Sequence, residues 1–394
     1  GRAIGRRGRH MKDPMKGNRF HYGGKRSGAN LSRCCRRLRD LHAFLRQRKR
    51  PLRFVVFALF HLTGFGCSIV AIMQTRTEQG ATAWALALNT VPIAAVPAWL
   101  VFGNHKVTDY PYTREVGRSE LRPVAAKLIH FPPGHAAPAN VGSSASPDSP
   151  PSLHRLAKIG SLPLTSGNSA SLLVDGKETF AALLDAISQA EDYILIQFYI
   201  FRDDDIGRTF RDALVERARS GVAVHVLVDA VGSMELSEDF VGSMTSAGIR
   251  VGSFMDASED PNRFQINFRN HRKILVVDGK VAFTGGFNIG DEYLGKDPEL
   301  TPWRDTHLEL RGPVVQCLQV PFVEDWLWVT GDLLDTLDWT LSPDNAAGEM
   351  EALCLASGPA DPFETCALGF LELIQGAKDR IWIATPYFVP DDKI

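Results

Sequence analysis

Two long uncharged runs dominate the hydropathy pattern of the first hundred residues. Residues 54–73 contain no formally charged side chain, and residues 81–102 form a second run, interrupted only by Asn89, Pro92 and Pro97. Each run is long enough to cross the hydrocarbon core of a bilayer as a helix. Buried helices of a soluble core are the alternative, but two such runs in tandem favour a transmembrane hairpin over residues 54–103.

From about residue 172 the pattern changes to helical segments that alternate with short apolar strands. The expected elements, in chain order, are a helix at 178–190, a strand at 193–200, a helix at 206–220, a strand at 223–229, a helix at 237–247, a strand at 250–254, strands within 271–288, a strand at 307–310 and a helix at 314–329. This alternation predicts an α/β sandwich built on a mixed sheet.

Charge divides the chain into two parts. Residues 1–53 hold 18 of the 44 Lys and Arg but two of the 45 acidic residues, so 26 basic residues face 43 acidic ones in the remainder, a formal net charge of −17. A basic tail can bind nucleic acid or an anionic membrane face, or be a solvated extension. The apolar runs that follow favour the membrane, and the acidic remainder argues against a nucleic-acid partner.

The same basic tail predicts the orientation of the hairpin. An excess of Lys and Arg before residue 54 places the N-terminus in the cytoplasm, so the connector 74–80 faces outward and the chain after Gly103 returns inside. A cleaved signal peptide is the competing interpretation, but the first run is long, lies far from the terminus and has no Ala-x-Ala site. The chain is therefore expected to cross a membrane more than once, with the part after Gly103 in the cytoplasm.

The six cysteines, at positions 34, 35, 67, 317, 354 and 366, show neither a CxxC spacing nor a His in ligand register. In so long a chain they predict no disulfide framework and no structural zinc. Residues 131–160 are rich in Pro, Ser, Ala and Gly, which is typical of a linker.

Six residues at fixed offsets mark the stretch 271–288, in the pattern HxK(x)4D(x)6GGxN. They are His271, Lys273, Asp278, Gly285, Gly286 and Asn288. His271 and Lys273 are two residues apart, so both point to one face of an extended segment that leads into a buried strand. Imidazole can take a phosphoryl group as a nucleophile, while an ammonium and an amide donate to oxygens that gain charge.

Singly, a His before a strand or a Gly-Gly pair after one is usually structural. The full register resembles the signature of the phospholipase D superfamily. That resemblance implies that His271 is the nucleophile, that Lys273, Asn288, Gly285 and Gly286 bind the phosphate, and that Asp278 is a structural carboxylate. Asp305 stands where superfamily members place the acceptor that orients the nucleophilic imidazole. No metal and no cofactor are implied.

Runs outside the signature are similar to those of bacterial cardiolipin synthases. They are 267–270 (Asn-Phe-Arg-Asn), 289–293 (Ile-Gly-Asp-Glu-Tyr), 303–307 (Trp-Arg-Asp-Thr-His), 325–326 (Asp-Trp) and 385–390 (Thr-Pro-Tyr-Phe-Val-Pro). The resemblance covers about residues 81–394. It implies transfer of a phosphatidyl group between two phosphatidylglycerol molecules through a phosphatidyl-histidine, with release of glycerol. It also implies that the membrane is the inner (plasma) membrane of a bacterial cell.

An internal repeat predicts how the catalytic part is organised. Residues 187–206 and 374–394 share spaced Ile, Ala, Asp and Tyr at an offset of 187 to 188, although chance similarity of two amphipathic segments is the alternative. The expected segments are a basic tail (1–53), two transmembrane helices (54–103), a linker (104–170), a first phospholipase D-like repeat (171–345) and the start of a truncated second repeat (346–394). With one His-Lys-Asn set, residues 1–394 alone are expected to lack synthase activity.

Three other functions remain open at this point. A membrane-bound phospholipase D would use water in place of the second lipid, and a nuclease of the superfamily would need a basic groove that the acidic catalytic part does not suggest. From a different class, the chain is a non-catalytic membrane protein that acts only through a partner. The expected partners are phosphatidylglycerol and other anionic membrane lipids, and homo-oligomerisation is left open.

Overall fold

The computed structural model describes residues 54–103, except 74, 76 and 77, and residues 150–390, except 161, 255–268, 335, 340–347, 359–360, 362–363, 386 and 388–389. The chain divides into two compact units, Gly1–Gly103 and Asn104–Ile394. The basic tail, part of the predicted connector, residues 104–149 of the predicted linker and the end of the predicted second repeat lie outside the described residues.

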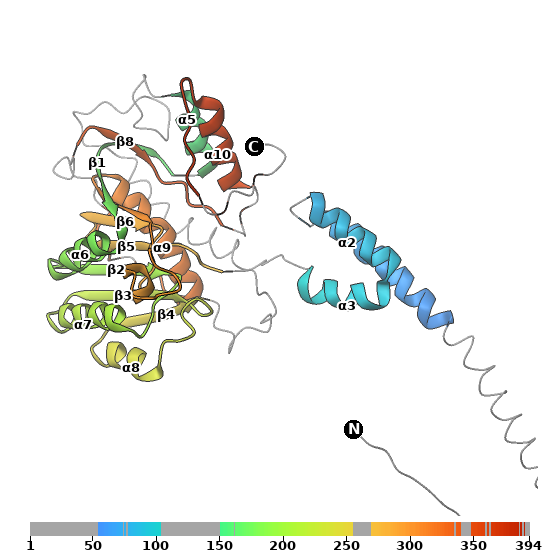
Figure 1. Cartoon of the computed structure of the whole chain (residues 1–394), viewed down its shortest axis with the longest axis horizontal. Helices are drawn as coiled ribbons and strands as arrows, with labels where there is room; N and C mark the ends of the chain where they lie inside the picture. Colours follow the sequence, from blue (N-terminus) through green and yellow to red (C-terminus); the bar gives the residue numbers. More distant parts are fainter. Residues whose placement is uncertain are drawn as a thin grey trace, which may run out of the picture. The chain divides into compact units, whose positions relative to one another are not determined.

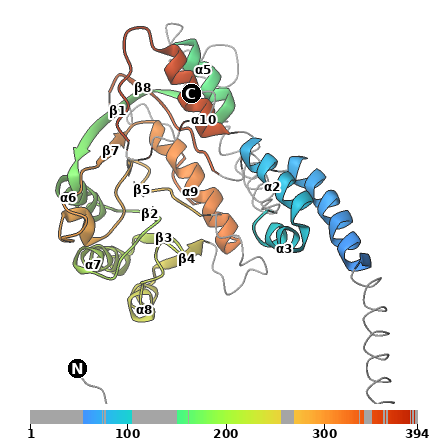
Figure 2. The same ribbon diagram turned by 45° about the vertical axis from the view of Figure 1, so that its right-hand side comes forward.

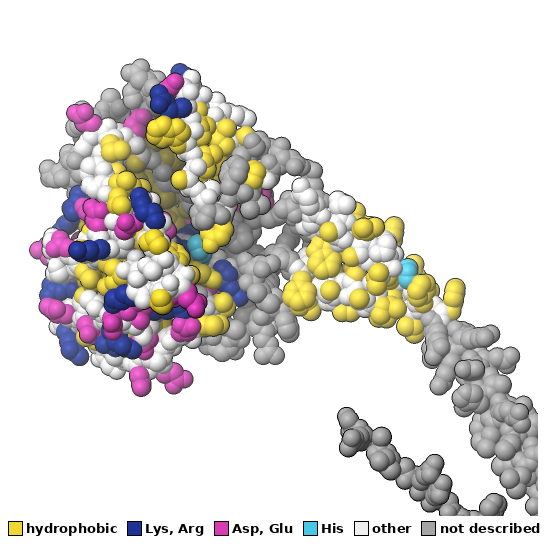
Figure 3. Space-filling view, in the orientation of Figure 1, with side chains coloured by type: hydrophobic (Ala, Val, Ile, Leu, Met, Phe, Trp, Pro, Cys, Tyr) yellow, Lys and Arg dark blue, Asp and Glu magenta, His cyan; other side chains and the backbone are white. Residues whose placement is uncertain are grey.

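Among the described residues of the first unit, one helix, Phe54–Met73, is long and apolar enough to cross a membrane. Most of its large apolar side chains are exposed, among them Phe54, Leu62 and Met73. In Figure 3, apolar side chains are spread over the visible face of the described helices of the first unit. An exposed apolar surface of this kind is typical of a membrane or protein interaction site.

The second apolar run is not one continuous spanning helix, in contrast to the prediction. It forms α2 (Glu78–Thr90) and α3 (Pro92–Phe102), with a break at Val91. Proline lacks a backbone N–H and disfavours helical geometry in the residue before it, which explains the break. A small core holds these helices together, with Ala71, Leu88 and Trp99 among its buried members.

The second unit is organised around one mixed sheet, which in the described residues has eight strands in the order β4-β3-β2-β5-β6-β7-β1-β8. The strands are β1 (Leu164–Val174), β2 (Tyr193–Phe198), β3 (Ala223–Asp229), β4 (Arg250–Phe254), β5 (Ile274–Val277), β6 (Val281–Gly285), β7 (Thr306–Arg311) and β8 (Met350–Leu353). Strand β2 pairs parallel to β3 and antiparallel to β5. Both kinds of pairing therefore meet at β2, in the middle of the sheet.

Helices cover both faces of this sheet (Figures 1 and 2). They are α5 (Pro151–Gly160), α6 (Asp175–Ser188), α7 (Asp205–Arg219), α8 (Glu238–Ser246), α9 (Val314–Thr330) and α10 (Thr365–Gly376), together with the 3₁₀ helix η1 (Asp291–Leu294). Alternate residues of β2 enter two separate cores: Ile194 and Ile196 pack under α6 and α7, while Leu195 packs under α9. This two-faced burial explains the continuous apolar strands.

The predicted α/β sandwich is confirmed, with differences near both ends of the repeat. Helix α5 and most of strand β1 lie within residues assigned to the linker, and β1 pairs with both β7 and β8. Strand β8 belongs to the stretch assigned to the second repeat but joins the same sheet. Helix α10 packs on α5, where Arg155 and Glu372 form an exposed ion pair of 2.7 Å. Strand β1 begins with mostly polar residues, α5 lies in the Pro- and Ser-rich stretch, and β8 has only four residues, so the sequence signal of each element is weak.

Candidate active site

The signature residues lie on and around the β5–β6 hairpin. Asp278 and Gly279 form its turn with φ values of 52° and 64°, and the N–H of Lys280 donates to the carbonyl of Val277 at 2.9 Å. Two consecutive positive φ values are typical of the type I′ turn, and Asp-Gly is a favoured pair for it. The turn thus brings β6, with Gly285 at its end, back beside the residues that precede β5.

Asp278 lies at the opposite end of β5 from His271. Its buried carboxylate accepts the backbone N–H groups of Glu191, Asp192 and Tyr193 at 2.8 to 2.9 Å. These three donors belong to the residues that open β2. The carboxylate therefore joins the hairpin turn to the start of the neighbouring strand.

We expect Asp278→Ala to destabilise the fold by at least roughly 3 kcal/mol, because three backbone donors lose their acceptor and Ala is strained at positive φ. Asp278→Asn keeps one acceptor oxygen and tolerates the turn, so its loss should be smaller. Denaturant unfolding of the two variants measures this difference. Equal stability of Asp278→Ala and the unaltered protein would contradict a structural role.

His271 and Lys273 meet at the other end of β5. The Lys273 ammonium lies 3.0 Å from His271 Nδ1 and 3.3 Å from Nε2, and donates to the His271 carbonyl at 2.9 Å. Tyr199, after β2, lies against both: its ring centroid is 4.8 Å from that of His271 and 5.6 Å from Lys273 Nζ. His271 is exposed whereas Lys273 is buried. An imidazole open to solvent thus lies directly above a buried cation.

This arrangement shifts both pKa values downward. Partial desolvation of its ring by the surrounding protein lowers the pKa of His271, and the charge of Lys273 lowers it further, against an opposing effect of Asp229. Burial lowers the pKa of Lys273 to about 8, with Asp305 acting in the other direction. At pH 7 the site therefore holds a neutral imidazole beside a mostly protonated amine.

Gly285 and Gly286 have no room for a side chain. A Cβ on Gly285 would lie 2.5 Å from Nδ1 of His307, and one on Gly286 would lie 2.1 and 2.3 Å from the carboxylate oxygens of Asp305. Because glycine has no Cβ, Gly285 and Gly286 allow His307 and Asp305 to lie directly beside the motif residues.

The hydrogen bond expected between Asp305 and His271 is not seen in the described part of the structure. The Asp305 carboxylate instead lies against Gly286 and accepts the Thr306 N–H at 2.7 Å, and its charge acts on Lys273. The His271 ring is held by Lys273 and Tyr199, which explains the difference from the sequence-based expectation.

Asn288 follows the glycine pair and is buried. Its Oδ1 accepts the Ile200 N–H at 3.1 Å, and its Nδ2 donates to the Tyr293 hydroxyl at 2.8 Å. An amide nitrogen has two N–H donors, so one remains for a phosphate oxygen. These contacts also join the end of the motif to the segment after β2 that carries Tyr199.

His307 is buried next to this cluster, and neither ring nitrogen has a protein partner among the described residues. Burial and the nearby Lys273 charge lower its pKa to about 4, so the ring is neutral at pH 7. No sequence motif predicts a role for His307, Tyr199 or Asp229. The position of Asp229 at the carboxyl end of a parallel strand was a usable signal, because ligand sites of open α/β sheets collect there.

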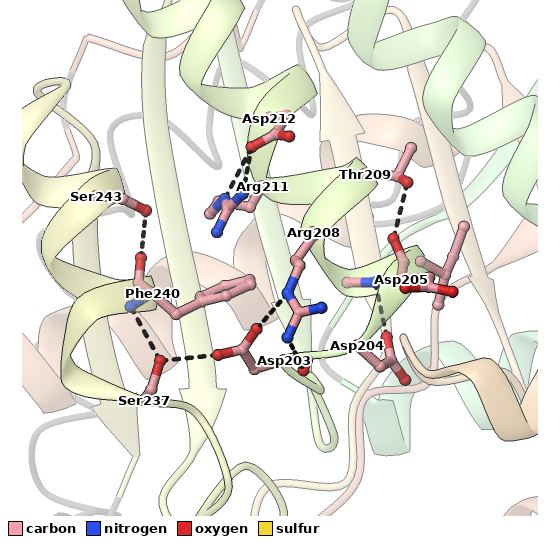
Figure 4. Close-up of polar contacts among 12 residues, drawn as sticks. Asp203, Asp204, Asp205, Arg208, Thr209, Arg211, Asp212, Ser237, Phe240 and Ser243 are labelled. Atoms are coloured by element: carbon pink, nitrogen blue, oxygen red, sulfur yellow. Dashed lines mark hydrogen bonds and ion pairs between the residues drawn. The ribbon is translucent and has the colours of Figure 1, made fainter.

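The acidic run 203–205 after β2 has a local structural role (Figure 4). Asp204 caps α7 by accepting the Gly207 N–H at 2.9 Å, and also accepts the Asp291 N–H at 2.6 Å. Asp203 binds Arg208 at 2.9 Å and the Ser237 hydroxyl at 2.8 Å. Across the residues that the structure describes, no three His, Cys, Asp or Glu side chains are arranged to hold a metal ion.

Comparison with known proteins identifies the family. Residues 183–326 match the family model described as "Cardiolipin synthase, PLD-like domain". Cardiolipin synthase A of Pseudomonas fluorescens is 43% identical over 86% of this chain and 69% of its own length, and that of Pseudomonas syringae is 42% identical over the same shares. The solved phosphatidylserine synthase of Haemophilus influenzae is 13% identical over 58% of each chain, with a TM-score of 0.40, too low to add to the assignment. The chain belongs to the bacterial cardiolipin synthase family, whose members are phosphatidyltransferases of the phospholipase D superfamily.

Proposed function

We propose that this protein makes cardiolipin by transferring a phosphatidyl group from one phosphatidylglycerol molecule to another. His271 attacks the phosphorus of the first lipid, a P–N bond forms, and the P–O bond to the head-group glycerol breaks. A primary hydroxyl of a second phosphatidylglycerol then attacks the phosphatidyl-histidine, which restores the imidazole. Each cycle converts two phosphatidylglycerol molecules into one cardiolipin and one glycerol.

The observation that carries this proposal is the exposed His271 imidazole above the buried Lys273 ammonium, 3.0 Å apart. A cation in a low-dielectric site stabilises the charge that develops on phosphate oxygens more strongly than it would in water. The lowered pKa of His271 keeps its lone pair available for attack at neutral pH. Nucleophile and charge stabiliser therefore occupy one site.

Other groups at this site take supporting roles. Asn288 donates to a phosphate oxygen, and Asp305 keeps Lys273 charged. The Gly286 N–H, expected to bind the phosphate, donates instead to the Thr306 carbonyl at 3.0 Å, and the glycine pair makes room for His307 and Asp305. Asp278 acts only through the fold of the hairpin. The departing glycerol needs a proton, which the family pattern assigns to a His of a second repeat. None of these residues requires a metal or a cofactor to act in this way.

The test follows glycerol release and lipid products in vesicles of phosphatidylglycerol that hold the protein together with a second His-Lys-Asn repeat, because residues 1–394 alone are expected to lack activity. This two-repeat protein is the unaltered reference for every variant. Cardiolipin and glycerol in a ratio of one to one support transfer. Phosphatidic acid in place of cardiolipin would show that water is the acceptor and that the protein is a phospholipase D-type phosphodiesterase. Absence of both products when both repeats are present would contradict the proposed enzymatic function.

We expect a bell-shaped dependence of kcat/KM on pH. Protonation of His271 removes the nucleophile, so activity falls as pH drops through its pKa, which lies below the usual value of 6.5. Deprotonation of Lys273 removes the phosphate ligand, so activity falls as pH rises through about 8. Asp305→Asn should move the alkaline limit to lower pH, since Asp305 raises the pKa of Lys273. An unchanged alkaline limit in this variant would contradict that role.

We place the protein in the inner membrane with its catalytic unit in the cytoplasm. The basic tail before the Phe54–Met73 helix supports this orientation, and the apolar run that forms α2 and α3 supports a return across the membrane. An impermeant thiol reagent added to intact cells should label a single cysteine introduced in the connector 74–80, but not one in the Pro/Ser-rich stretch 131–160. Labelling at the second position would overturn the orientation.

A further inference from the structure

A buried polar network surrounds the residues that flank His271. Asp325, on α9, is fully buried, and its Oδ2 accepts from the Asn270 amide at 2.6 Å and from the Gln197 amide at 2.8 Å. The Arg272 guanidinium donates to the same oxygen and forms an ion pair with Asp325. One carboxylate oxygen thus binds the residue before His271, the residue after it and the central strand β2.

Two further contacts close the turn around His271. The Asn270 Oδ1 accepts the backbone N–H of Arg272 at 3.1 Å, and the Asn270 N–H donates to Asp229 at 2.9 Å. Asp229 ends β3 and also accepts the N–H groups of Val231 and Gly232 at 2.9 and 3.0 Å. The backbone on both sides of His271 is therefore fixed by carboxylates from two elements far away in the sequence.

A network of this kind is an unusual way to gain stability. Burying a carboxylate and a guanidinium costs solvation that their attraction offsets only with good geometry, and well-packed apolar residues often serve stability equally well. Hydrogen-bonded buried polar networks restrict the local structure to one arrangement. Here Asn270, Gln197 and Arg272 all donate to Asp325, although Gln197 Oε1 has no partner among the described residues. His271 has little else to restrict it, because its ring is exposed and its described side-chain contacts are Lys273 and Tyr199.

We infer that Asp325 is a positioning residue for the nucleophile: it holds Asn270 and Arg272, and through them aims the His271 imidazole at the phosphorus. The inference rests on the proposed role of His271 as nucleophile. Attack requires the reacting atoms about 3 to 3.5 Å apart and in line, and a misplacement of about 1 Å can lower the rate roughly 100-fold. Asp325 itself is too deeply buried to reach a lipid.

The test compares Asp325→Asn with Gln319→Ala in phosphatidylglycerol vesicles. Gln319 is an equally buried polar residue of α9, six residues earlier, and it binds Tyr193 at 2.6 Å, away from His271. Asp325→Asn should lower kcat about 100-fold with KM changed less than about threefold, because the His271 imidazole is no longer held in line with the phosphorus while lipid binding is kept. Gln319→Ala, at similar thermal stability, should keep kcat within about threefold.

Double variants separate positioning from simple loss of stability. Asp325→Asn combined with Arg272→Gln removes both buried charges, and should be no slower than Asp325→Asn alone, because both changes break the same support. Asp325→Asn combined with Gln319→Ala should show the product of the single effects. If Asp325→Asn does not fold, the double variant without these two charges is compared with Gln319→Ala in its place.

Two results would overturn the inference. The first is a folded Asp325→Asn variant with the kcat of the unaltered enzyme. The second is a double variant, Asp325→Asn with Arg272→Gln, whose loss of kcat equals the product of the two single losses. Both presuppose an unaltered enzyme that makes cardiolipin and loses this activity with His271→Ala. A failure of the proposed function is recognised earlier, by absence of cardiolipin from the unaltered protein.

Discussion

We expect the His271→Ala variant to release glycerol from phosphatidylglycerol vesicles at least about 10⁴-fold more slowly than the unaltered protein. Removal of a nucleophile eliminates the covalent route itself, and a loss of this size is usual for groups that act as a unit. Binding of lipid should persist, because the substitution leaves Lys273 and Asn288 in place. The loss should therefore fall on kcat rather than on KM.

His154→Ala is the matched control for this variant. His154 lies on α5, far in the sequence from the motif residues 271–288, and receives the same substitution. Its activity should stay within about twofold of the unaltered protein, and both variants should melt at similar temperatures because neither ring is fully buried. Normal rates in His271→Ala would assign the nucleophile to another residue.

A second readout tests the covalent step directly. The unaltered enzyme is mixed with phosphatidylglycerol radiolabelled at its phosphate, and the reaction is stopped rapidly without acid. If His271 forms a phosphatidyl-histidine, label should remain on the protein. The label should be stable to base, labile to acid and absent from His271→Ala. Label that persists in the variant would contradict the proposed intermediate, even if the overall rate has fallen.

The sequence alone identified the central elements because their signals are local. The strands at 223–229 and 250–254 match β3 and β4, and the helix at 314–329 matches α9 to within one residue. Short apolar runs and clear caps, such as Ser237, whose hydroxyl oxygen accepts the Phe240 N–H, mark such boundaries without tertiary information. The i, i+2 spacing of His271 and Lys273 likewise predicted that the two side chains lie together.

The contacts that complete the site were not predictable in the same way, since they join distant segments. Asp278 binds residues 85 to 87 positions earlier, and Asp325 binds Gln197 from 128 positions away. Asp305 was expected on the His271 ring but lies against Gly286, a difference in side-chain placement rather than in fold. A motif specifies which residue types are present, whereas rotamers and long-range pairing decide which atoms meet.

Lys273→Met should lower kcat/KM by a factor of roughly 100 to 1,000, since one donor to a developing phosphate charge is worth on the order of 3 kcal/mol. Met fills a similar volume without a charge, so loss of a buried ammonium should leave folding stability nearly unchanged. Lys280→Met is the matched control: Lys280 lies on the hairpin turn, is exposed, and pairs with Glu191 at 3.5 Å. An exposed pair of this kind contributes little, so its activity should be unaffected.

The pH profile of Lys273→Met separates an electrostatic role from a packing role. In the unaltered protein the Lys273 charge lowers the pKa of His271, so removal of that charge should raise this pKa toward its usual value. The acid limit of kcat/KM should then move to higher pH, and the alkaline limit near 8, which reports Lys273, should disappear. A variant that is slow but keeps both limits would show that Lys273 supports the site by packing alone, and that the cation acting on the phosphate is another residue.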